Sequence, residues 1–287
     1  MAAALADYIK HAPVISPQLL ALFPHLVAVM DRNSEHLQHL LCIFLDGVIG
    51  NVNEKGMMCS LPVVEMLIQC FPNDAPGLLE RILQKLLKIV IVGTGEADTV
   101  RASAGAVLAR ILVQNSLFFA QWISQPSLVS MLGQFSSKTS ENLLFTYIDS
   151  WLEKVDFLTT IPRKKICALA LCVLLTTKEP EVLERLEQIL SVCTTLVHQT
   201  DESSGEGALS YDYLLPTVQH EERSSENEEL RWRQILAADP INKLAVVPLL
   251  KERLQTCSSV HGEAALNAAL SKMHPSLLNQ LQQLLGT

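Results

Sequence analysis

Signals for the start of a helix recur along this chain at intervals of about forty residues, in two interleaved series. Oxygen-bearing side chains cap the free backbone N–H groups of a first helical turn. Proline also fits that turn, because its missing N–H would have no partner there. The first series lies at Ser16-Pro17, Ser60-Leu61-Pro62, Glu96-Ala97, Ser140-Glu141 and Glu179-Pro180, and the second at Ser34-Glu35, Asp74-Ala75-Pro76, Asn115-Ser116 and Thr160-Ile161-Pro162.

Two interleaved series of helix starts predict helical hairpins in tandem. A period near forty residues is typical of HEAT and armadillo repeats, so we expect an all-α fold, an α-solenoid of HEAT-type antiparallel helical hairpins. Hydrophobic residues make up 49% of the chain but aromatic residues only 5%, which suits helices packed on helices better than β-sheets. The pattern divides the chain into a HEAT-repeat array over 1–198, an acidic flexible loop over 199–229, and C-terminal helices over 230–287 that close the solenoid.

Two segments predict how the helices pack. The stretch 102–106 reads Ala-Ser-Ala-Gly-Ala, and such small residues let neighbouring helices approach closely. The run 166–175 is apolar on nearly every face, as expected for a helix that is covered by neighbours on both sides.

Charge is distributed unevenly along the chain. There are 22 Lys and Arg against 30 Asp and Glu, a net charge of −8. Residues 201–229 include nine acidic residues and one basic residue, so this segment carries 1 − 9 = −8 and the rest of the chain sums to zero. The short basic run Arg163-Lys164-Lys165 is interpreted as a solvated first turn of a helix. The nine acidic residues are Asp201, Glu202, Glu206, Asp212, Glu221, Glu222, Glu226, Glu228 and Glu229.

This distribution bears on the choice of partner. A neutral array has no electrostatic reason to bind nucleic acid or anionic lipid, because both need clustered Lys and Arg. A polyanionic loop beside a solenoid surface attracts a basic protein; the alternative is that the segment is a solubilising linker. The candidate partner-binding residues are Asp201, Glu202, Glu206, Glu221, Glu222, Glu226, Glu228 and Glu229.

Cysteines and apolar runs indicate the compartment. The seven cysteines form no Cys-X-X-Cys pair and mostly lie within apolar stretches, which is typical of reduced core cysteines in a cytosolic or nuclear protein. The N-terminus has no basic start before an apolar stretch. The longest apolar run is about half of what spans a bilayer, so we expect a soluble intracellular protein without membrane insertion.

Patterns that resemble catalytic or cofactor sites are incomplete. Gly93 and Gly95 follow an apolar run, as in a nucleotide-binding turn, but Asp98 occupies the position of the third glycine. We interpret these glycines as caps at a helix end; a nucleotide site there is the enzyme alternative. His36 and His39 share a helix face, yet no further metal ligands are indicated. We therefore expect no enzyme activity, no metal and no cofactor.

Residues 230–254, LRWRQILAADPINKLAVVPLLKERL, follow the acidic segment and precede a last amphipathic stretch. They resemble the C-terminal end of the importin-β family, and within it the importin-eleven-like branch. The resemblance lies in a basic helix that runs into an Asp-Pro step, followed by an apolar helix that ends in a basic residue and leucine. The residues that carry it are Arg231, Trp232, Arg233, Leu236, Asp239, Pro240, Leu249, Leu250, Arg253 and Leu254.

The resemblance implies the C-terminal portion of a nuclear transport receptor, present in the cytoplasm, in the nucleus and at the nuclear pore. Such receptors hold protein cargo on the concave face of HEAT hairpins, contact phenylalanine-glycine nucleoporins on the convex face, and release cargo when the GTPase Ran binds. They are much longer than this chain, and their Ran-binding N-terminal repeats have no counterpart here. The alternative is a cytoplasmic HEAT-repeat scaffold for a kinase, phosphatase or ubiquitin-ligase assembly.

Overall fold

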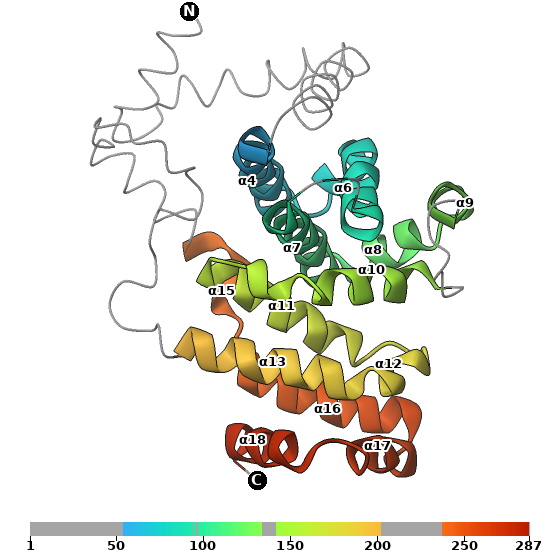
Figure 1. Ribbon diagram of the computed structural model, residues 1–287, viewed down its shortest axis with the longest axis vertical. Coiled ribbons are helices and arrows are strands. Elements are labelled where there is room, and N and C mark those ends of the chain that lie inside the picture. Colours follow the sequence, from blue (N-terminus) through green and yellow to red (C-terminus); the bar gives the residue numbers. More distant parts are fainter. Residues whose placement is uncertain (1–53, 94, 96, 134–141, 202–236, 287) are drawn as a thin grey trace, which may run out of the picture.

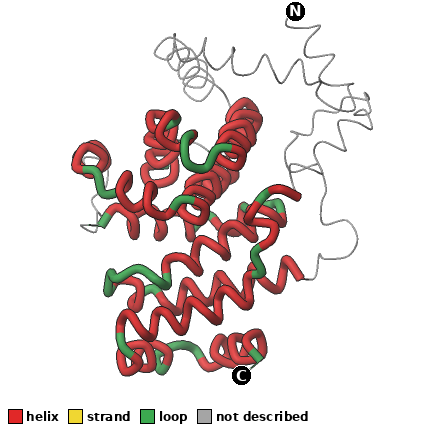
Figure 2. The backbone as a smooth tube through the Cα atoms, turned by 180° about the vertical axis from the view of Figure 1, so that it is seen from behind, coloured by secondary structure: helices red, strands yellow, loops and turns green. Residues whose placement is uncertain are grey.

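The computed structural model describes residues 54–93, 95, 97–133, 142–201 and 237–286. Within these residues all regular secondary structure is helical, and the helices are stacked along the long axis of the molecule (Figure 1). Figure 2 shows the same stack from behind, with short loops between the helices. The all-α prediction is confirmed for this part of the chain.

The helices fall into a longer and a shorter set. The longer helices are α4 (Glu54–Cys70), α6 (Glu80–Val92), α7 (Asp98–Gln114), α10 (Leu143–Leu152), α11 (Ile161–Leu174), α13 (Leu186–Asp201), α16 (Val246–His261) and α18 (Pro275–Leu285). The shorter elements are α5 (Ala75–Leu78), α8 (Ser116–Ile123), α9 (Pro126–Gly133), the 3₁₀ turn η1 (Val155–Phe157), α12 (Glu181–Glu184), α15 (Pro240–Lys243) and α17 (Glu263–Leu270).

Helices α7 and α11 form the middle of the array. Helix α7 packs against α4, α6 and α11, and α11 packs in turn against α13 and α16. Helix α11 is therefore covered on several sides, which confirms the interpretation of its apolar faces. Neither α11 nor any other helix among the described residues is long and apolar enough to cross a membrane.

The C-terminal helices do not simply continue the stack. Helices α17 and α18 pack on α13 and α16 at the far end of the molecule, but the short α15 lies back against α7 (Figure 1). The chain after the acidic segment therefore first contacts the middle of the array and only then covers its end.

Several predicted helix starts are confirmed. Helix α8 begins after Asn115, whose side-chain oxygen accepts a hydrogen bond from the backbone N–H of Phe118 at 3.1 Å. Helix α11 begins after Thr160, with Pro162 in its first turn. The starts predicted near residues 16, 34 and 140 lie outside the described residues.

The start predicted at Ser60-Leu61-Pro62 is wrong. Helix α4 already begins at Glu54, and Pro62 lies inside it. A proline within a helix removes one backbone hydrogen bond, but Leu61 and Pro62 are both buried, and packing of α4 against α7 offsets that loss. The start predicted at Glu179-Pro180 opens only the one-turn α12; the longer α13 follows it after Arg185.

The small residues of α7 let α10 approach closely, as predicted. Tyr147 Oη donates a hydrogen bond to the Gly105 carbonyl at 2.9 Å, and Trp151 Nε1 donates one to the Ala102 carbonyl at 3.0 Å. Both rings are fully buried, and they stack with centroids 5.9 Å apart. The rings reach the carbonyls of α7 because Gly105 has no side chain to block them. Burial also raises the pKa of the Tyr147 hydroxyl, so this group remains a donor.

The buried thiols act as small apolar groups. Cys167, Cys172, Cys193 and Cys257 are free and buried, whereas Cys70 is exposed. A hydrogen bond with Cys172, together with burial, raises the pKa of the Cys193 thiol, and burial raises the pKa of Cys167. Cys167 and Cys193 therefore stay protonated and contribute to packing between α11 and α13.

We expect Gly105→Ala to destabilise the fold. A Cβ at this position overlaps the Trp151 ring, so the ring must shift, at a cost of about 1–3 kcal/mol in the free energy of unfolding. Gly77→Ala is the matched control, because a Cβ there meets nothing within 4 Å, and we expect it to leave stability unchanged or raise it by about 0.5 kcal/mol. Urea unfolding followed by circular dichroism measures both variants; equal effects at the two positions would contradict the close approach of α10 to α7.

Candidate functional site

The acidic residues proposed to bind a partner lie almost entirely outside the described residues. Glu202, Glu206, Glu221, Glu222, Glu226, Glu228 and Glu229 fall in the range 202–236. Asp201 is the last residue of α13, and its side chain is not among those described. The histidines at 36 and 39 also lie outside. Partner binding by the acidic segment therefore stays a prediction.

Gly93 ends a helix, as interpreted from the sequence. It adopts a left-handed conformation with φ of 59°, and its N–H bonds to the Ile89 carbonyl at 3.1 Å. The apolar run before it is the last part of α6 and not a strand. This geometry is that of a glycine cap and differs from a strand that feeds a phosphate-binding turn.

The interpretation of Arg163 as part of a solvated turn is wrong. Its side chain is only 4% exposed. Arg163 Nη1 donates to Ser103 Oγ at 2.9 Å, and Nη2 lies 3.5 Å from Glu65 Oε2. The first turn of α11 is not solvated here because it faces α7 and α4, both of which present polar groups to it.

Arg163 is one member of a buried ion network, which consists of Glu65, Arg110, Arg163 and Asp239. Arg110 lies at its centre: Nε donates to Glu65 Oε1 at 3.3 Å and Nη1 donates to Asp239 Oδ2 at 2.9 Å. None of the four residues is more than 4% exposed. Among these four residues, two guanidinium groups face two carboxylates. A buried charge is tolerated when it is paired and hydrogen-bonded in this way.

Each member of the buried ion network comes from a different helix or helix cap. Glu65 and Arg110 lie on the packed faces of α4 and α7, and Arg163 lies in the first turn of α11. Asp239 is the N-cap of α15, and its Oδ1 accepts a hydrogen bond from Ile241 N at 3.0 Å. The same carboxylate thus starts α15 and pairs with α7.

Lys165 adds a second polar tie to α15. Its Nζ donates to the Asn242 carbonyl at 3.0 Å. Burial lowers the pKa of this ammonium group, and the nearby Asp239 carboxylate opposes that effect. Together, Lys165 and the buried ion network fasten the chain after residue 236 to the middle of the array.

The buried ion network was not predicted, although the sequence contains two signals for it. Glu65 and Arg110 each interrupt an otherwise apolar stretch, Val63 to Ile68 and Val107 to Val113. Opposite charges on the core faces of neighbouring hairpins indicate a buried pair, but which charges meet depends on the packing. The Asp239-Pro240 step was noticed only as part of a family resemblance.

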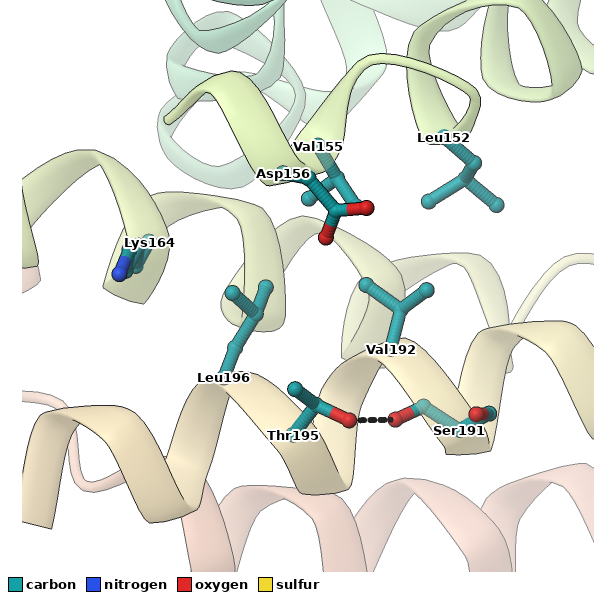
Figure 3. A pocket seen from close by; sticks show the side chains of 8 residues that line it. All are labelled: Leu152, Val155, Asp156, Lys164, Ser191, Val192, Thr195 and Leu196. Carbon is teal, nitrogen blue, oxygen red and sulfur yellow. Dashed lines mark hydrogen bonds between the residues drawn. The ribbon is translucent and has the colours of Figure 1, made fainter. Parts of the chain in front are cut away.

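A surface groove of about 280 Å³ lies between α13 and the end of α10 with η1 (Figure 3). Val155 and Asp156 face Val192 and Leu196 across the groove (Figure 3). The groove is smaller than the roughly 300–1,000 Å³ of typical small-molecule sites. Its lining includes one carboxylate, one ammonium group and two hydroxyl groups, and no histidine or cysteine. Its lining is formed by Leu152, Val155, Asp156, Lys164, Ser191, Val192, Thr195 and Leu196.

The polar side chains of the buried ion network and of the groove edge bond to other groups of this chain. No group of three or more His, Cys, Asp or Glu in that part of the chain is placed to hold a metal ion. The hydroxyl of Thr195, at the edge of the groove, donates to the Ser191 carbonyl of its own helix at 2.9 Å. What these residues form is a packed helical array with an extended surface.

Comparison with known proteins connects this array to a family. Residues 41–286 match the family model described as importin-11-like TPR repeats. Importin-11 of Mus musculus is 23% identical to this chain over 96% of the chain and 31% of its own length, and importin-11 of Homo sapiens is 22% identical over the same shares. The importin beta-like protein kap113 of Schizosaccharomyces pombe is 24% identical over 84% of the chain and 24% of its own length.

The chain spans less than a third of the length of these relatives. No solved structure matches it. The relatives are named importins, which are transport receptors and not enzymes. The family describes its repeats as TPR, whereas the forty-residue period predicted the HEAT type; both are tandem helical hairpins that stack into α-solenoids. The match over most of the chain confirms both the helical hairpins in series and the resemblance at residues 230–254. The chain belongs to the importin-11-like family of helical-repeat proteins.

Proposed function

We propose that this chain is the C-terminal, cargo-binding part of an importin-β-type receptor for the nuclear import of proteins. The observation that carries the proposal is the match to importin-11-like repeats over residues 41–286. This match favours nuclear transport over the scaffold of a kinase, phosphatase or ubiquitin-ligase assembly. On this proposal the protein moves between the cytoplasm and the nucleus and contacts phenylalanine-glycine nucleoporins at the nuclear pore.

The packing supports a role in which the array stays rigid while it binds. Twelve of the seventeen residues of α7 and nine of the fourteen residues of α11 are buried. The Tyr147 and Trp151 rings of α10 are buried as well. A well-packed array loses little conformational entropy when a partner docks, and such preorganisation favours affinity. Stacked hairpins also leave an extended surface, on which a large protein can be held through many weak contacts.

The acidic segment supports a preference for basic cargo. It carries the whole net charge of −8, and the helices on either side of it, α13 and α15, pack against α11 and α7 respectively. The described chain is therefore packed into the array both before residue 202 and after residue 236. A concentrated negative charge at the edge of a rigid surface raises the encounter rate with a positively charged protein.

We expect neutralisation of the acidic segment to weaken binding of basic cargo. The variant changes Asp to Asn and Glu to Gln at the eight candidate positions, Asp201, Glu202, Glu206, Glu221, Glu222, Glu226, Glu228 and Glu229. A fluorescent peptide rich in lysine and arginine serves as the probe. At low ionic strength its affinity should fall by about tenfold or more, and its dependence on salt should flatten, because the local field that steers it is gone.

The control for this experiment removes the same charge from other places. It neutralises eight exposed carboxylates of the array, which also brings the net charge from −8 to zero. Binding that responds to the segment variant and not to the array variant supports the proposed site. If both variants weaken binding equally, the effect is due to net charge alone. If neither variant changes the affinity for the peptide, the acidic segment does not capture cargo. The eight array positions are Asp74, Glu153, Asp156, Glu179, Glu184, Glu187, Glu252 and Glu263.

We expect this chain to keep its cargo in the presence of Ran loaded with GTP. The resemblance implies that release depends on N-terminal repeats that bind Ran, so we expect residues 1–287 by themselves not to bind Ran. A pull-down with the immobilised chain and the basic peptide, with and without Ran-GTP, measures this directly. Retention of Ran on the chain, or displacement of the peptide by Ran-GTP, would contradict the expectation that Ran acts only through the N-terminal repeats.

A further inference from the structure

We propose that residues 211–215 of this chain, Tyr-Asp-Tyr-Leu-Leu, dock into the surface groove between η1 and α13 and so hold part of the acidic segment against the array. The groove is made of described residues, and the proposed occupant is a segment of the same chain. This inference goes beyond cargo binding, because it concerns where the acidic segment lies when no partner is present.

The first support is the lining of the groove. Asp156 of η1 and Lys164 of α11 contribute a carboxylate and an ammonium group to it. Neither side chain forms an ion pair within the part of the chain that the structure describes. The groove therefore combines two unpaired opposite charges with apolar walls. The walls are formed by Leu152, Val155, Val192 and Leu196 (Figure 3).

The second support is the composition of the acidic segment. Every aliphatic or aromatic residue of 199–229 falls between Ala208 and Val218, and four of them lie within 211–215. The remaining residues of 199–229 are polar, charged, glycine or proline. Tyrosine and leucine side chains gain free energy when they leave water. A segment of this composition offers them little apolar surface of its own, whereas the groove on the preceding helix does.

The third support is that the charges of the two surfaces are complementary. Asp212 is the one charged residue between Gly207 and His220, and it pairs with Lys164 in the docked state. A tyrosine hydroxyl donates to the Asp156 carboxylate. Solvent-exposed ion pairs contribute little to affinity, so Asp212 sets the orientation of the segment, while the apolar side chains supply most of the binding.

The length of the chain permits the docking. Helix α13 carries Val192 and Leu196 and ends at Asp201. The nine residues from Val192 to Asp201 cover about 14 Å of helix. The ten residues from Asp201 to Tyr211 reach up to about 33 Å when extended, so they are long enough to turn back along α13. Docking within one chain also takes place at a high effective concentration, so a weak contact is sufficient.

Carbodiimide crosslinking of the unmodified chain tests the docking without any partner. The reagent joins a carboxylate to a lysine amine at contact distance, and mass spectrometry of the digested chain identifies the joined residues. We expect Lys164 to be the main partner of Asp212. Lys178 and Lys251 are exposed lysines outside the groove and serve as internal controls. Equal crosslinking of Asp212 to all three lysines, or no crosslink to Lys164, would overturn the proposal.

Substitutions in the groove and in its occupant test the same contact from both sides. Val192→Asp places a charge in the apolar wall and should lower the yield of the Asp212–Lys164 crosslink by about fivefold or more. Gln188→Asp is the matched control: it adds the same charge one turn earlier on α13, at an exposed position outside the lining, and should change the yield less than about twofold. The chain with Leu214→Ser and Leu215→Ser leaves the described array intact and should lose the crosslink to the same extent as Val192→Asp. An unchanged yield in this double variant, or equal effects of the two α13 variants, would overturn the docking.

A peptide added from outside shows whether the chain's own segment fills the groove. A fluorescent peptide with the sequence of residues 208–218 should bind the chain with Leu214→Ser and Leu215→Ser about fivefold more tightly than the unmodified chain, whose groove is already occupied. Equal binding to both chains would mean that the groove stands free for another occupant, and absence of binding to both would mean that it does not recognise the segment; either result overturns the proposal. No cargo is present in these experiments, so a failure of docking is distinguished from a failure of cargo capture.

Discussion

The close approach of α10 to the small-residue face of α7 is the contact on which the rest of the array depends. Helix α7 touches α4, α6, α8 and α11, so its surface fixes the spacing of every neighbour. Gly105 lets Tyr147 and Trp151 reach backbone carbonyls that larger side chains would cover. Twelve of the seventeen residues of α7 are buried, so apolar packing against this helix positions most of its neighbours.

The buried ion network adds specificity to this otherwise apolar packing. Apolar faces of similar helices are nearly interchangeable, whereas a buried carboxylate tolerates only the position that offers it a guanidinium group. Glu65, Arg110 and Asp239 lie far apart in the sequence but within hydrogen-bonding distance in the fold. Their pairing fixes where the described chain resumes after residue 236, against the middle of the array.

Local sequence signals predicted local features well and long-range pairing poorly. Asn115 was recognised as a helix start because side-chain capping depends on residues a few positions apart. The start after Thr160 was recognised with the help of Pro162, which lies in the first turn of α11. Pro62 was misplaced because tertiary burial outweighs a local preference against proline inside α4. Arg163 was taken for a surface residue because its partners, Ser103 and Glu65, are 60 and 98 positions away. No local sequence pattern predicts a partner so far away in the chain. The whole buried ion network could not be predicted for the same reason, because its members are distant in the sequence.

The central claim is that basic protein partners are captured by the acidic segment beside the array. Zero-length carbodiimide crosslinking, which joins carboxylates to lysine amines at contact distance, tests it most directly with the lysine-rich peptide bound to the chain. The account predicts crosslinks from the peptide to carboxylates within residues 201–229. Crosslinks confined to carboxylates of the helical array, such as Glu153 or Glu184, would contradict it.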